Sequence, residues 1–585
     1  MYDKLSKVEK IIFDVLSVIL VLFYSYSAVL QPASTQYHRG IYVIITYVLA
    51  FLLYKSKHKL MRIVDYLLIL LSIFTIGYWI LNFEAINYRT GAETPFDMAV
   101  AVVGVLIGIE LARRVVGTVF VVLGVLLLLY GVFGDYVPDL FAHAGDTFPG
   151  LCTSIFYKSD GVFGIMANVL ATYVILFVLF GAFLEKSGAQ RFFIDFPLAA
   201  VGHRVGGPAK VSVIASGLFG SISGSAIANT VSTGAFTIPM MKKAGFRPHI
   251  AGGIEPAASI SGMFMPPIMG AGGFIMAELT GVAYSRIMLV AIFPAIMYVF
   301  SVFIMVHYEA KKYNIKGEKS EHSAMEILRT QWYYTMPLIV ITILMLYGFS
   351  PGYSAILGIV TCLVISWFKT DTRITPKRFI EASRAGTENS LKIGATVGVI
   401  GIIIGVLTYS GLVLTFADIV IELASGAVFG GIDFRLVATI FLIALASLVL
   451  GMGVPVTAAY LITAVVAVPA LIHLGVNEIA AHMIVYWLSQ DSNITPPVCI
   501  AAFAGATIAK ANMWRTAFAS FKFAKFLYLG PFLFGYVPGF SLNGSGWDII
   551  KAFVLILFGT YAYSWILSGI WMKYFKKGSE KSTAS

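Results

Sequence analysis

GLFGSISGSAIANTVSTGAFTIPMMKKAGFRPHIAGGIEPAASISGMFMPPIMGAGGFIMAELT, residues 217–280, is an apolar stretch that small and polar residues interrupt. It is rich in Gly, Ser and Ala between Gly220 and Asn229, and Pro266-Pro267 lies near its other end. Such residues break a continuous membrane-spanning helix. Irregular backbone is tolerated at membrane depth only where protein buries it or where it lines a wet cavity. The stretch therefore predicts a site rather than a lipid-facing span.

The same pattern of helix breakers occurs twice. At an offset of 230 residues, Pro239, Gly245, Pro266 and Pro267 correspond to Pro469, Gly475, Pro496 and Pro497. The same register places Thr233 on Thr463 and Ser259 on Ser489. A matched pair of Gly/Pro-interrupted apolar segments in two halves of a chain indicates the binding site of a transporter.

The loops between these breakers differ in charge. MKKAGFRPH (241–249) carries three Lys or Arg residues, whereas LIHLGVNEI (471–479) carries none. Basic loops prefer the cytoplasmic side of a membrane. We therefore expect the two loops to face opposite sides, which an inverted-topology repeat requires.

The composition is that of a membrane protein. Of the 585 residues, 58% are hydrophobic and 12% are charged, against about 25% charged in soluble domains. Apolar runs of about 20 residues recur along the chain and predict a polytopic helical protein. The net charge of +11 comes from Lys and Arg in short loops, so it indicates topology and not nucleic-acid binding. The three scattered cysteines predict neither a disulfide framework nor a zinc cluster.

The pattern divides the chain into two modules. Residues 1–145 form a small helical module with expected spans near 11–30, 40–54, 62–82, 98–112 and 117–136. Residues 150–575 form a large module with repeats around 206–308 and 436–540, and further spans near 163–185, 392–410 and 548–571. KTDTRITPKRFIEASR (369–384) is expected as an amphipathic surface helix. Basic loops place the N-terminus in the cytoplasm. The predicted fold class is an all-α polytopic membrane protein with inverted repeats and broken helices.

Helices that break inside the membrane point their ends at a common cavity. Helix N-termini suit a carboxylate, and C-terminal ends with unwound carbonyls suit a small cation. Side-chain oxygens add ligands for a hard cation, and glycines allow close backbone approach. In the first repeat the candidate contacts are Ser221, Ser223, Gly224, Ser225, Asn229, Thr233, Gly262, Met265, Pro266 and Pro267. In the second repeat they are Gly451, Gly453, Thr457, Asp491, Asn493, Thr495, Pro496 and Pro497, with Ser492 beside them. The alternative is that these small residues only permit tight helix packing.

Four titratable residues within the repeats are weighed separately. Asp491 is a functional candidate because carboxylates within a membrane usually serve function, and the alternative is a solvated aspartate at the interface. Glu255 and Glu278 have no visible partner, so capping or loop roles are as plausible as functional ones. His482 is expected to be a packing histidine.

The motifs favour a transporter without its own energy source. The sequence has no HExxH and no GxxxxGK[ST], so neither a zinc protease nor ATP binding through a P-loop is indicated. We expect no cofactor, and the driving energy then comes from an ion gradient or another subunit. Two alternatives stay open, an uncoupled ion or solute channel and an intramembrane enzyme.

The chain resembles the tripartite ATP-independent periplasmic (TRAP) transporters. The resemblance rests on GSISGSAIANTVSTG (220–234), GGIEPAASISGMFMPPIMGA (252–271), GMGVPVTAAY (451–460) and ITPPVCIAAFAGA (494–506). LARRVVG (111–117) and GGPAKVSVIASGLFGS (206–221) add to it. It is similar above all to fused permeases that work with TAXI-type solute-binding proteins. Residues 1–145 then match the small membrane subunit, and 150–575 match the large one.

This resemblance implies a multi-pass symporter of the bacterial inner membrane that uses sodium to import organic acids. A periplasmic TAXI-type binding protein would deliver the substrate, a small carboxylate such as a C4–C5 dicarboxylate or an amino acid. The large module would work as an elevator, in which a domain of broken helices slides against a scaffold. The candidate contacts above would then bind substrate and sodium, and neither ATP nor nucleic acid would take part.

Overall fold

The structure is a computed structural model that describes residues 2–56, 59–318, 320, 322–429, 432–452 and 454–569. Within these residues the regular secondary structure is helical, apart from a small hairpin of β1 (Val428–Phe429) and β2 (Ile432–Asp433). Ten helices of the described part are long and apolar enough to cross a membrane. The prediction of an all-α polytopic membrane protein is confirmed.

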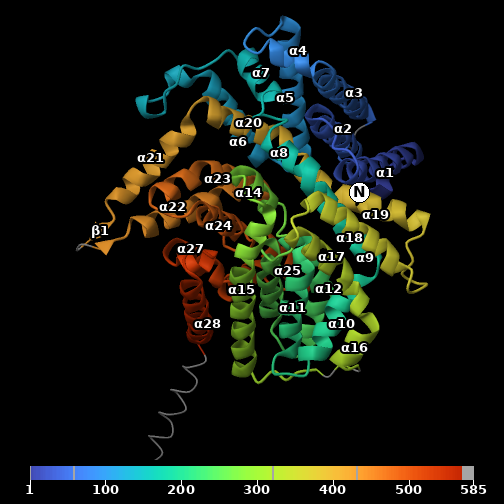
Figure 1. The fold of residues 1–585 in the computed structure, drawn as a ribbon, viewed down its shortest axis with the longest axis vertical. Helices are drawn as coiled ribbons and strands as arrows, with labels where there is room; N and C mark the ends of the chain where they lie inside the picture. Colours follow the sequence, from blue (N-terminus) through green and yellow to red (C-terminus); the bar gives the residue numbers. More distant parts are fainter. Residues whose placement is uncertain are drawn as a thin grey trace, which may run out of the picture.

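The small module lies at the top of Figure 1, in blue. Its helices are α1 (Lys7–Val29), α2 (Thr35–Leu53), α3 (Lys59–Leu81), α4 (Phe83–Tyr88), α5 (Pro95–Val115) and α6 (Thr118–Val132). Capping boxes fix two of their starts, because Ser6 pairs with Glu9 and Thr94 with Asp97 in reciprocal hydrogen bonds. Short 3-10 turns at Gly134–Tyr136 and Asp139–Phe141 end the module.

The first half of the large module leads into the interrupted stretch. It comprises α7 (Phe148–Tyr157), α8 (Ile165–Val169), a π-helical turn (Leu170–Val174), α9 (Ile175–Lys186), α10 (Ala189–Val201), α11 (Gly207–Ser223), α12 (Ala226–Lys243), α13 (Pro248–Ser259), the 3-10 turn η5 (Ile260–Met263), α14 (Gly272–Thr280) and α15 (Tyr284–Lys312). The long α15 runs down the centre of Figure 1, beside α11.

The second half contains α16 (Ala324–Gln331), α17 (Met336–Leu346), α18 (Pro351–Ser366), α19 (Pro376–Gly394), α20 (Val397–Tyr409) and α21 (Leu412–Ser425). The second interrupted stretch follows as α22 (Arg435–Leu450), α23 (Val456–His473), α24 (Glu478–Ser489), the 3-10 turn η7 (Asp491–Asn493) and α25 (Ile500–Ala509). The described part ends with α26 (Met513–Phe523), α27 (Phe526–Tyr536) and α28 (Gly546–Ser568).

The expected surface helix at 369–384 is corrected. The structure has a longer helix, α19, whose first turn is exposed but which is buried along one face from Ala382 onward. It packs against α9, where a Cβ on Gly386 would lie 2.8 Å from Leu179 Cδ2. Small residues on its inner face allow this close approach, and charge on the other face produced the amphipathic pattern.

The internal repeat is visible in the backbone. Helix α23 begins and ends 230 residues after α12, and α24 does the same after α13. The backbone also turns into the left-handed region at matching residues, with φ of 57° at Met269 and 48° at Cys499. The two stretches of sequence therefore fold into the same series of helices and breaks.

The two broken helices run antiparallel to each other. Near the start of α13, a Cβ on Gly252 would lie 2.9 Å from Gly505 O, close to the end of α25. At the break, a Cβ on Gly272 would lie 2.0 Å from the ring of Tyr486, in the last turns of α24. The first helix of one broken pair, α13, therefore lies beside the second helix of the other, α25, and α14 lies beside α24. This is the arrangement of an inverted repeat. The prediction of inverted repeats is confirmed.

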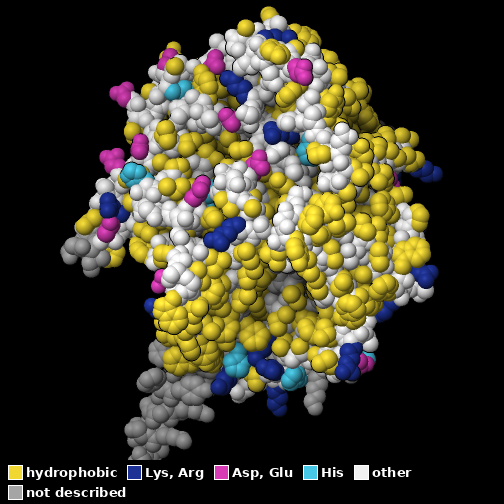
Figure 2. Space-filling view, in the orientation of Figure 1, with side chains coloured by type: hydrophobic (Ala, Val, Ile, Leu, Met, Phe, Trp, Pro, Cys, Tyr) yellow, Lys and Arg dark blue, Asp and Glu magenta, His cyan; other side chains and the backbone are white. Residues whose placement is uncertain are grey.

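The surface agrees with a membrane protein of defined orientation. Figure 2 shows broad hydrophobic areas over the helices, with acidic side chains gathered toward the upper left and mainly Lys, Arg and His along the lower edge. Basic residues favour the cytoplasmic side. The lower edge in this view is therefore assigned to the cytoplasm.

We expect Lys243→Cys and His473→Cys, each introduced alone, to react with a membrane-impermeant maleimide from opposite sides. The two side chains are exposed at corresponding ends of α12 and α23. The native Cys152, Cys362 and Cys499 are buried, which keeps the background low. Labelling of both variants from the same side of intact cells would contradict the inverted repeat.

Candidate functional site

The first hairpin tip lies between α11 and α12. Gly224 ends α11 in the left-handed region at φ 59°, and the Ser225 hydroxyl accepts a hydrogen bond from the Ala228 N–H at 3.3 Å as the N-cap of α12. A Cβ on Gly224 would lie 3.1 Å from the Cα of Gly270. The tip therefore rests on the unwound segment between α13 and α14.

The second hairpin tip takes the corresponding place in the other repeat. A Cβ on Gly451 would lie 2.4 Å from Ser492 Cβ, so this tip rests on η7 at the break between α24 and α25. Pro455 is the N-cap of α23. Gly453, a predicted contact, lies outside the described residues. Each repeat thus brings a hairpin tip onto its own broken helix.

Tyrosine hydroxyls pair the backbone carbonyls that the first break releases. The Tyr486 hydroxyl contacts Met269 O at 2.6 Å and also Met263 O. The Tyr284 hydroxyl contacts Ile268 O at 2.6 Å and Pro267 O at 2.9 Å. A buried carbonyl without a donor is costly. These two rings therefore allow α13 to unwind in an apolar setting.

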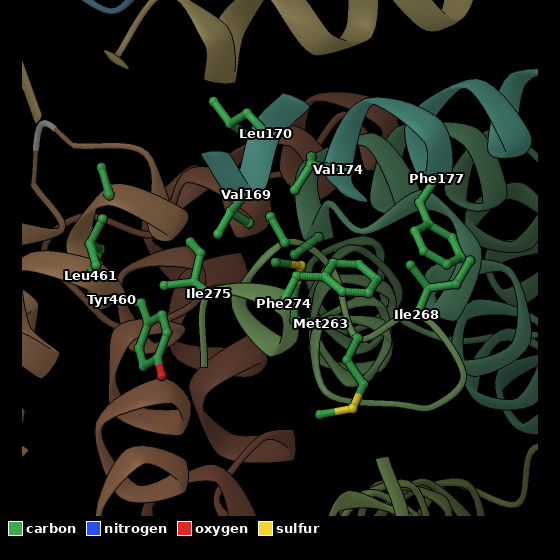
Figure 3. Packing of buried hydrophobic residues seen from close by; sticks show 14 of the residues in the cluster. Val169, Leu170, Val174, Phe177, Met263, Ile268, Phe274, Ile275, Tyr460 and Leu461 are labelled. Atoms are coloured by element: carbon green, nitrogen blue, oxygen red, sulfur yellow. The ribbon is translucent and has the colours of Figure 1, made fainter. Parts of the chain in front are cut away.

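Apolar side chains close the space around this break. Figure 3 shows Val174 and Phe177, from the π-helical turn and α9, beside Phe274 of α14 and Ile268 of the unwound segment. The rings of Phe177 and Phe274 stack with their centroids 4.8 Å apart. The first half of the large module therefore packs directly on the broken helix.

A hydroxyl cage surrounds Glu255, and the sequence analysis did not find it. The Glu255 side chain is 0% exposed. Its carboxylate lies within hydrogen-bonding distance of five hydroxyls, those of Ser212 (2.5 Å), Ser216 (2.5 Å), Ser259 (3.3 Å), Thr233 and Thr237. Of the two roles that the sequence left open for Glu255, a capping or loop role does not agree with this burial. A signal was present, because three pairs of these residues are spaced by four, and that spacing places side chains on one helix face.

The second repeat has no such cage. The position that corresponds to Glu255 is Val485, and Thr463, which corresponds to Thr233, has no hydrogen-bond partner for its buried hydroxyl among the described residues. Six further buried side-chain oxygens of this repeat lack a partner in the described part: Thr439 Oγ1, Ser447 Oγ, Thr457 Oγ1, Gln490 Oε1, Asp491 Oδ1 and Ser520 Oγ. The second repeat therefore has more unpaired buried oxygens than the first, in which Thr230 Oγ1 alone lacks a partner among the described residues.

Asp491 is buried, with 3% of its surface exposed. The alternative of a solvated aspartate at the interface does not hold for this structure. The aspartate begins η7, directly after Gln490, and its Oδ1 is among the unpaired oxygens. Its neighbour Asn493 donates to Gln490 O at 3.3 Å. A buried carboxylate beside unpaired amide and hydroxyl oxygens suits a hard cation.

The remaining predicted residues differ in how deeply they are buried. Asn229 and Thr233 are buried beside the Glu255 cage, where the Asn229 amide donates to Ser216 O at 2.8 Å. Another group is half-exposed at corresponding places of the two repeats, and comprises Ser223, Gly224, Ser225, Met265 and Pro266 in the first and Thr495 and Pro496 in the second. Of the predicted residues next to these, Ser221, Gly262, Pro267, Gly451, Thr457 and Asn493 are buried, and Pro497 is exposed. The half-exposed group is accessible to a solute, and its role stays a prediction.

Two titratable residues have structural partners. The buried His482 lies with its Nδ1 3.0 Å from the Tyr460 hydroxyl, which agrees with the expected packing role. Glu278 accepts a hydrogen bond from the Asn168 amide at 2.8 Å. Asn168 in turn accepts from Arg39 Nε at 3.2 Å, so this chain of contacts links α14 to the small module.

The sequence matches a known family over most of its length. The family model described as "Tripartite ATP-independent periplasmic transporter, DctM component" matches residues 103–540, about three quarters of the chain. A C4-dicarboxylate TRAP transporter large permease protein of Pseudomonas aeruginosa is 25% identical over 68% of this chain and 93% of its own length. A sialic acid TRAP transporter permease protein of Haemophilus influenzae is 23% identical over 57% of this chain and 52% of its own. Among solved structures, the Alcanivorax borkumensis YdaH transporter aligns with a TM-score of 0.48 and 17% identity, over 73% of this chain and 98% of its own.

We expect Tyr486→Phe to lower the free energy of unfolding by about 1–3 kcal/mol, because the one O–H that two buried carbonyls share is lost while the ring is kept. Denaturation of the detergent-solubilised protein, followed by tryptophan fluorescence, measures this loss. Tyr88→Phe is the matched control, because Tyr88 is 92% exposed. Equal stability of the Tyr486 and Tyr88 variants would contradict the role given to the Tyr486 hydroxyl.

Proposed function

Because the chain belongs to the DctM-component family of TRAP transporters, we propose that it imports a small organic acid in symport with sodium, and that a periplasmic solute-binding protein delivers the acid. The family consists of permeases and not of enzymes, and its members carry out secondary transport. With ten candidate spans in its described part, the chain is a multi-pass protein of the bacterial inner membrane. A solute-binding partner and a small acid as substrate follow from the family. Sodium coupling and the TAXI type of the partner are the proposed refinements.

The arrangement of helix ends carries this proposal. Four helices begin at these places: α12 at Ala226 and α23 at Val456 start from the hairpin tips, and α14 at Gly272 and α25 at Ile500 start from the breaks. Helix N-termini carry partial positive charge and free N–H groups, which attract a carboxylate. The half-exposed prolines Pro266 and Pro496 lie in these breaks, so a solute can reach them. A small carboxylate such as a C4–C5 dicarboxylate or an amino acid is the proposed substrate.

The unpaired oxygens of the second repeat support a bound cation. A buried acceptor without a donor costs about 1–3 kcal/mol, and a cation coordinated by several such oxygens removes that cost. Asp491 supplies a negative charge, and Gln490 and Thr457 supply neutral oxygens. In the first repeat, the Ser223 hydroxyl at the hairpin tip is only weakly hydrogen-bonded, because its contacts with Gly220 O and Ser225 O are both 3.5 Å long.

The small module is proposed to act as a fused small subunit that braces the moving helices. Arg384 of α19 forms two hydrogen bonds of 2.7 Å with Asp14 of α1. Arg39 of α2 donates to Phe163 O at 2.7 Å, just before α8. These contacts join residues 1–145 to α8 and α19, and through Asn168 of α8 they also reach Glu278 of α14. A fixed scaffold needs such contacts if the broken helices are to move as an elevator.

We expect accumulation of the acid in proteoliposomes only when the chain, its periplasmic binding protein and an inward sodium gradient are all present. The binding protein would be purified first, and the acid that co-purifies with it would serve as the substrate. An uncoupled channel would instead equilibrate the acid without accumulation, and an enzyme would convert it without any gradient. Rapid uptake by the chain alone, saturating at low substrate, would contradict the proposed function.

We expect Ser223→Ala and Asp491→Asn to raise the sodium concentration for half-maximal uptake by about 5- to 150-fold, because each removes one ligand contact worth about 1–3 kcal/mol. Ser225→Ala is avoided, because the Ser225 hydroxyl also caps α12. Ser425→Ala and Asp418→Asn, both at exposed sites on α21, are the matched controls. If the site variants lowered protein yield but left the sodium dependence unchanged, these residues would serve packing alone.

A further inference from the structure

Three polar side chains connect the small module to the first broken helix. Arg39 of α2 donates from Nε to Asn168 Oδ1 at 3.2 Å, and the Asn168 amide nitrogen donates to Glu278 Oε1 at 2.8 Å. The two ends of the amide match their partners, because a guanidinium can only donate and a carboxylate can only accept. Arg39 is held in turn by its hydrogen bond to Phe163 O at 2.7 Å. Asn168 of α8 therefore joins a cation of the small module to a carboxylate of α14.

Apolar side chains surround this connection. Figure 3 shows Val169 and Val174 beside Phe274 and Ile275 of α14, and all four are buried. The ring of Tyr173 stacks on that of Phe274 with the two centroids 5.6 Å apart. Hydrophobic contact is non-directional, so these surfaces alone do not fix one position of α14 against α8 and the π-helical turn.

The hydrogen bond between Asn168 and Glu278 is the exception along this boundary. Helices α1–α10 form one side of the boundary, and α11–α14 with α22–α27 form the other. In the parts of these helices that the structure describes, no second side-chain hydrogen bond and no salt bridge joins the two sides. A hydrogen bond weakens steeply with distance and angle. This contact is therefore the one that depends most sharply on the relative position of the two sides.

The stability of α14 does not explain the position of Glu278. This glutamate is the third residue from the C-terminal end of the helix, where the helix dipole disfavours a negative charge. At the offset of 230 residues, the second repeat has Ile508 in α25. The fold of the repeat therefore does not require a carboxylate here, which leaves the contact with Asn168 as its structural role.

Water can replace this contact when it breaks. Glu278 is exposed and Asn168 is half-buried. Glu278 also lines a cavity of about 330 Å³, whose walls include Ala277 of α14 on one side and Gly348, in the turn between α17 and α18, on the other. A polar contact that is open to water contributes little free energy. It can therefore favour one conformation without preventing another.

We propose that Arg39, Asn168 and Glu278 form a latch, which holds α14 against the small module in the conformation of this structure and opens when the broken helices move. The inference rests on the proposed elevator movement for its purpose. Opening separates Asn168 from Glu278 and leaves Arg39 bound to Phe163 O. Exposed polar contacts shift an equilibrium by about 2- to 5-fold. The latch therefore biases the movement and does not block it.

Distances between two spin labels across the boundary test the latch in lipid nanodiscs. The labels are attached to Tyr88→Cys of α4 and Lys243→Cys of α12, since both side chains are exposed and the native cysteines are buried. With the latch intact we expect at least two distances, one of which is that of this structure. Asn168→Ala and Glu278→Ala should each lower the population at that distance, relative to the others, by about 2- to 5-fold.

The double variant Asn168→Ala/Glu278→Ala should change the distances no more than either single variant, because each substitution opens the same connection. Glu422→Ala is the matched control and should leave the distances unchanged, since Glu422 is an exposed glutamate in the last turn of α21. Unchanged populations in both single variants, one distance only in every protein, or single effects that add in the double variant would overturn the proposal.

Hydrogen exchange at the end of α14 separates the latch from the helix dipole. If only the dipole mattered, Glu278→Ala would slow amide exchange there, because it removes an unfavourable charge. We expect instead that exchange over residues 275–280 becomes about 2- to 5-fold faster, since α14 then spends more time away from α8. Slower or unchanged exchange would contradict the latch. Because these measurements need no substrate, sodium gradient or binding protein, their failure is distinct from a failure of sodium-driven transport.

Discussion

The structure depends on pairing the backbone groups that a broken helix exposes inside a membrane. Water is absent there, so each free carbonyl needs a donor from the protein. In the first repeat, tyrosines from α15 and from the opposite repeat provide these donors, and Tyr486 alone bridges two carbonyls on either side of the break. The break of one repeat is therefore stabilised by a side chain of the other. This contact places the first break directly beside α24 of the opposite repeat.

The two repeats share a backbone but differ in how their polar groups are paired. In the first, the carboxylate of Glu255 and five hydroxyls satisfy each other in a closed cage. In the second, Val485 replaces the acid, and Thr463 and Asp491 keep buried oxygens without donors in the described part. A closed set of hydroxyls leaves few oxygens free for an ion, whereas open oxygens suit a cation. The internal symmetry thus supplies the architecture, and its violations supply chemically different sites.

The join between the modules is polar and ordered. The salt bridge between Arg384 and Asp14 and the contacts of Arg39 link helices far apart in the chain. Charged hydrogen bonds of this kind have demanding geometry, so they fix relative position more than they add stability. Close backbone contact adds to this, because a Cβ on Gly398 of α20 would lie 2.7 Å from the Cα of Gly108 on α5. In the proposed elevator, these contacts hold the frame against which the broken helices would move.

The sequence alone determined the repeat, its offset, the breaks and the opposite charge of the corresponding loops, because Pro, Gly and Lys act on the backbone locally or through the membrane. It also marked the hairpin tips. Only the tertiary structure decided which side chains meet. The hydroxyls around Glu255 come from three helices, and the burial of Asp491 depends on its neighbours. For the same reason, the charged face of α19 suggested a surface helix, although its other face is buried against α9. Helix spacing predicts which residues share a face, but packing alone selects what that face contacts.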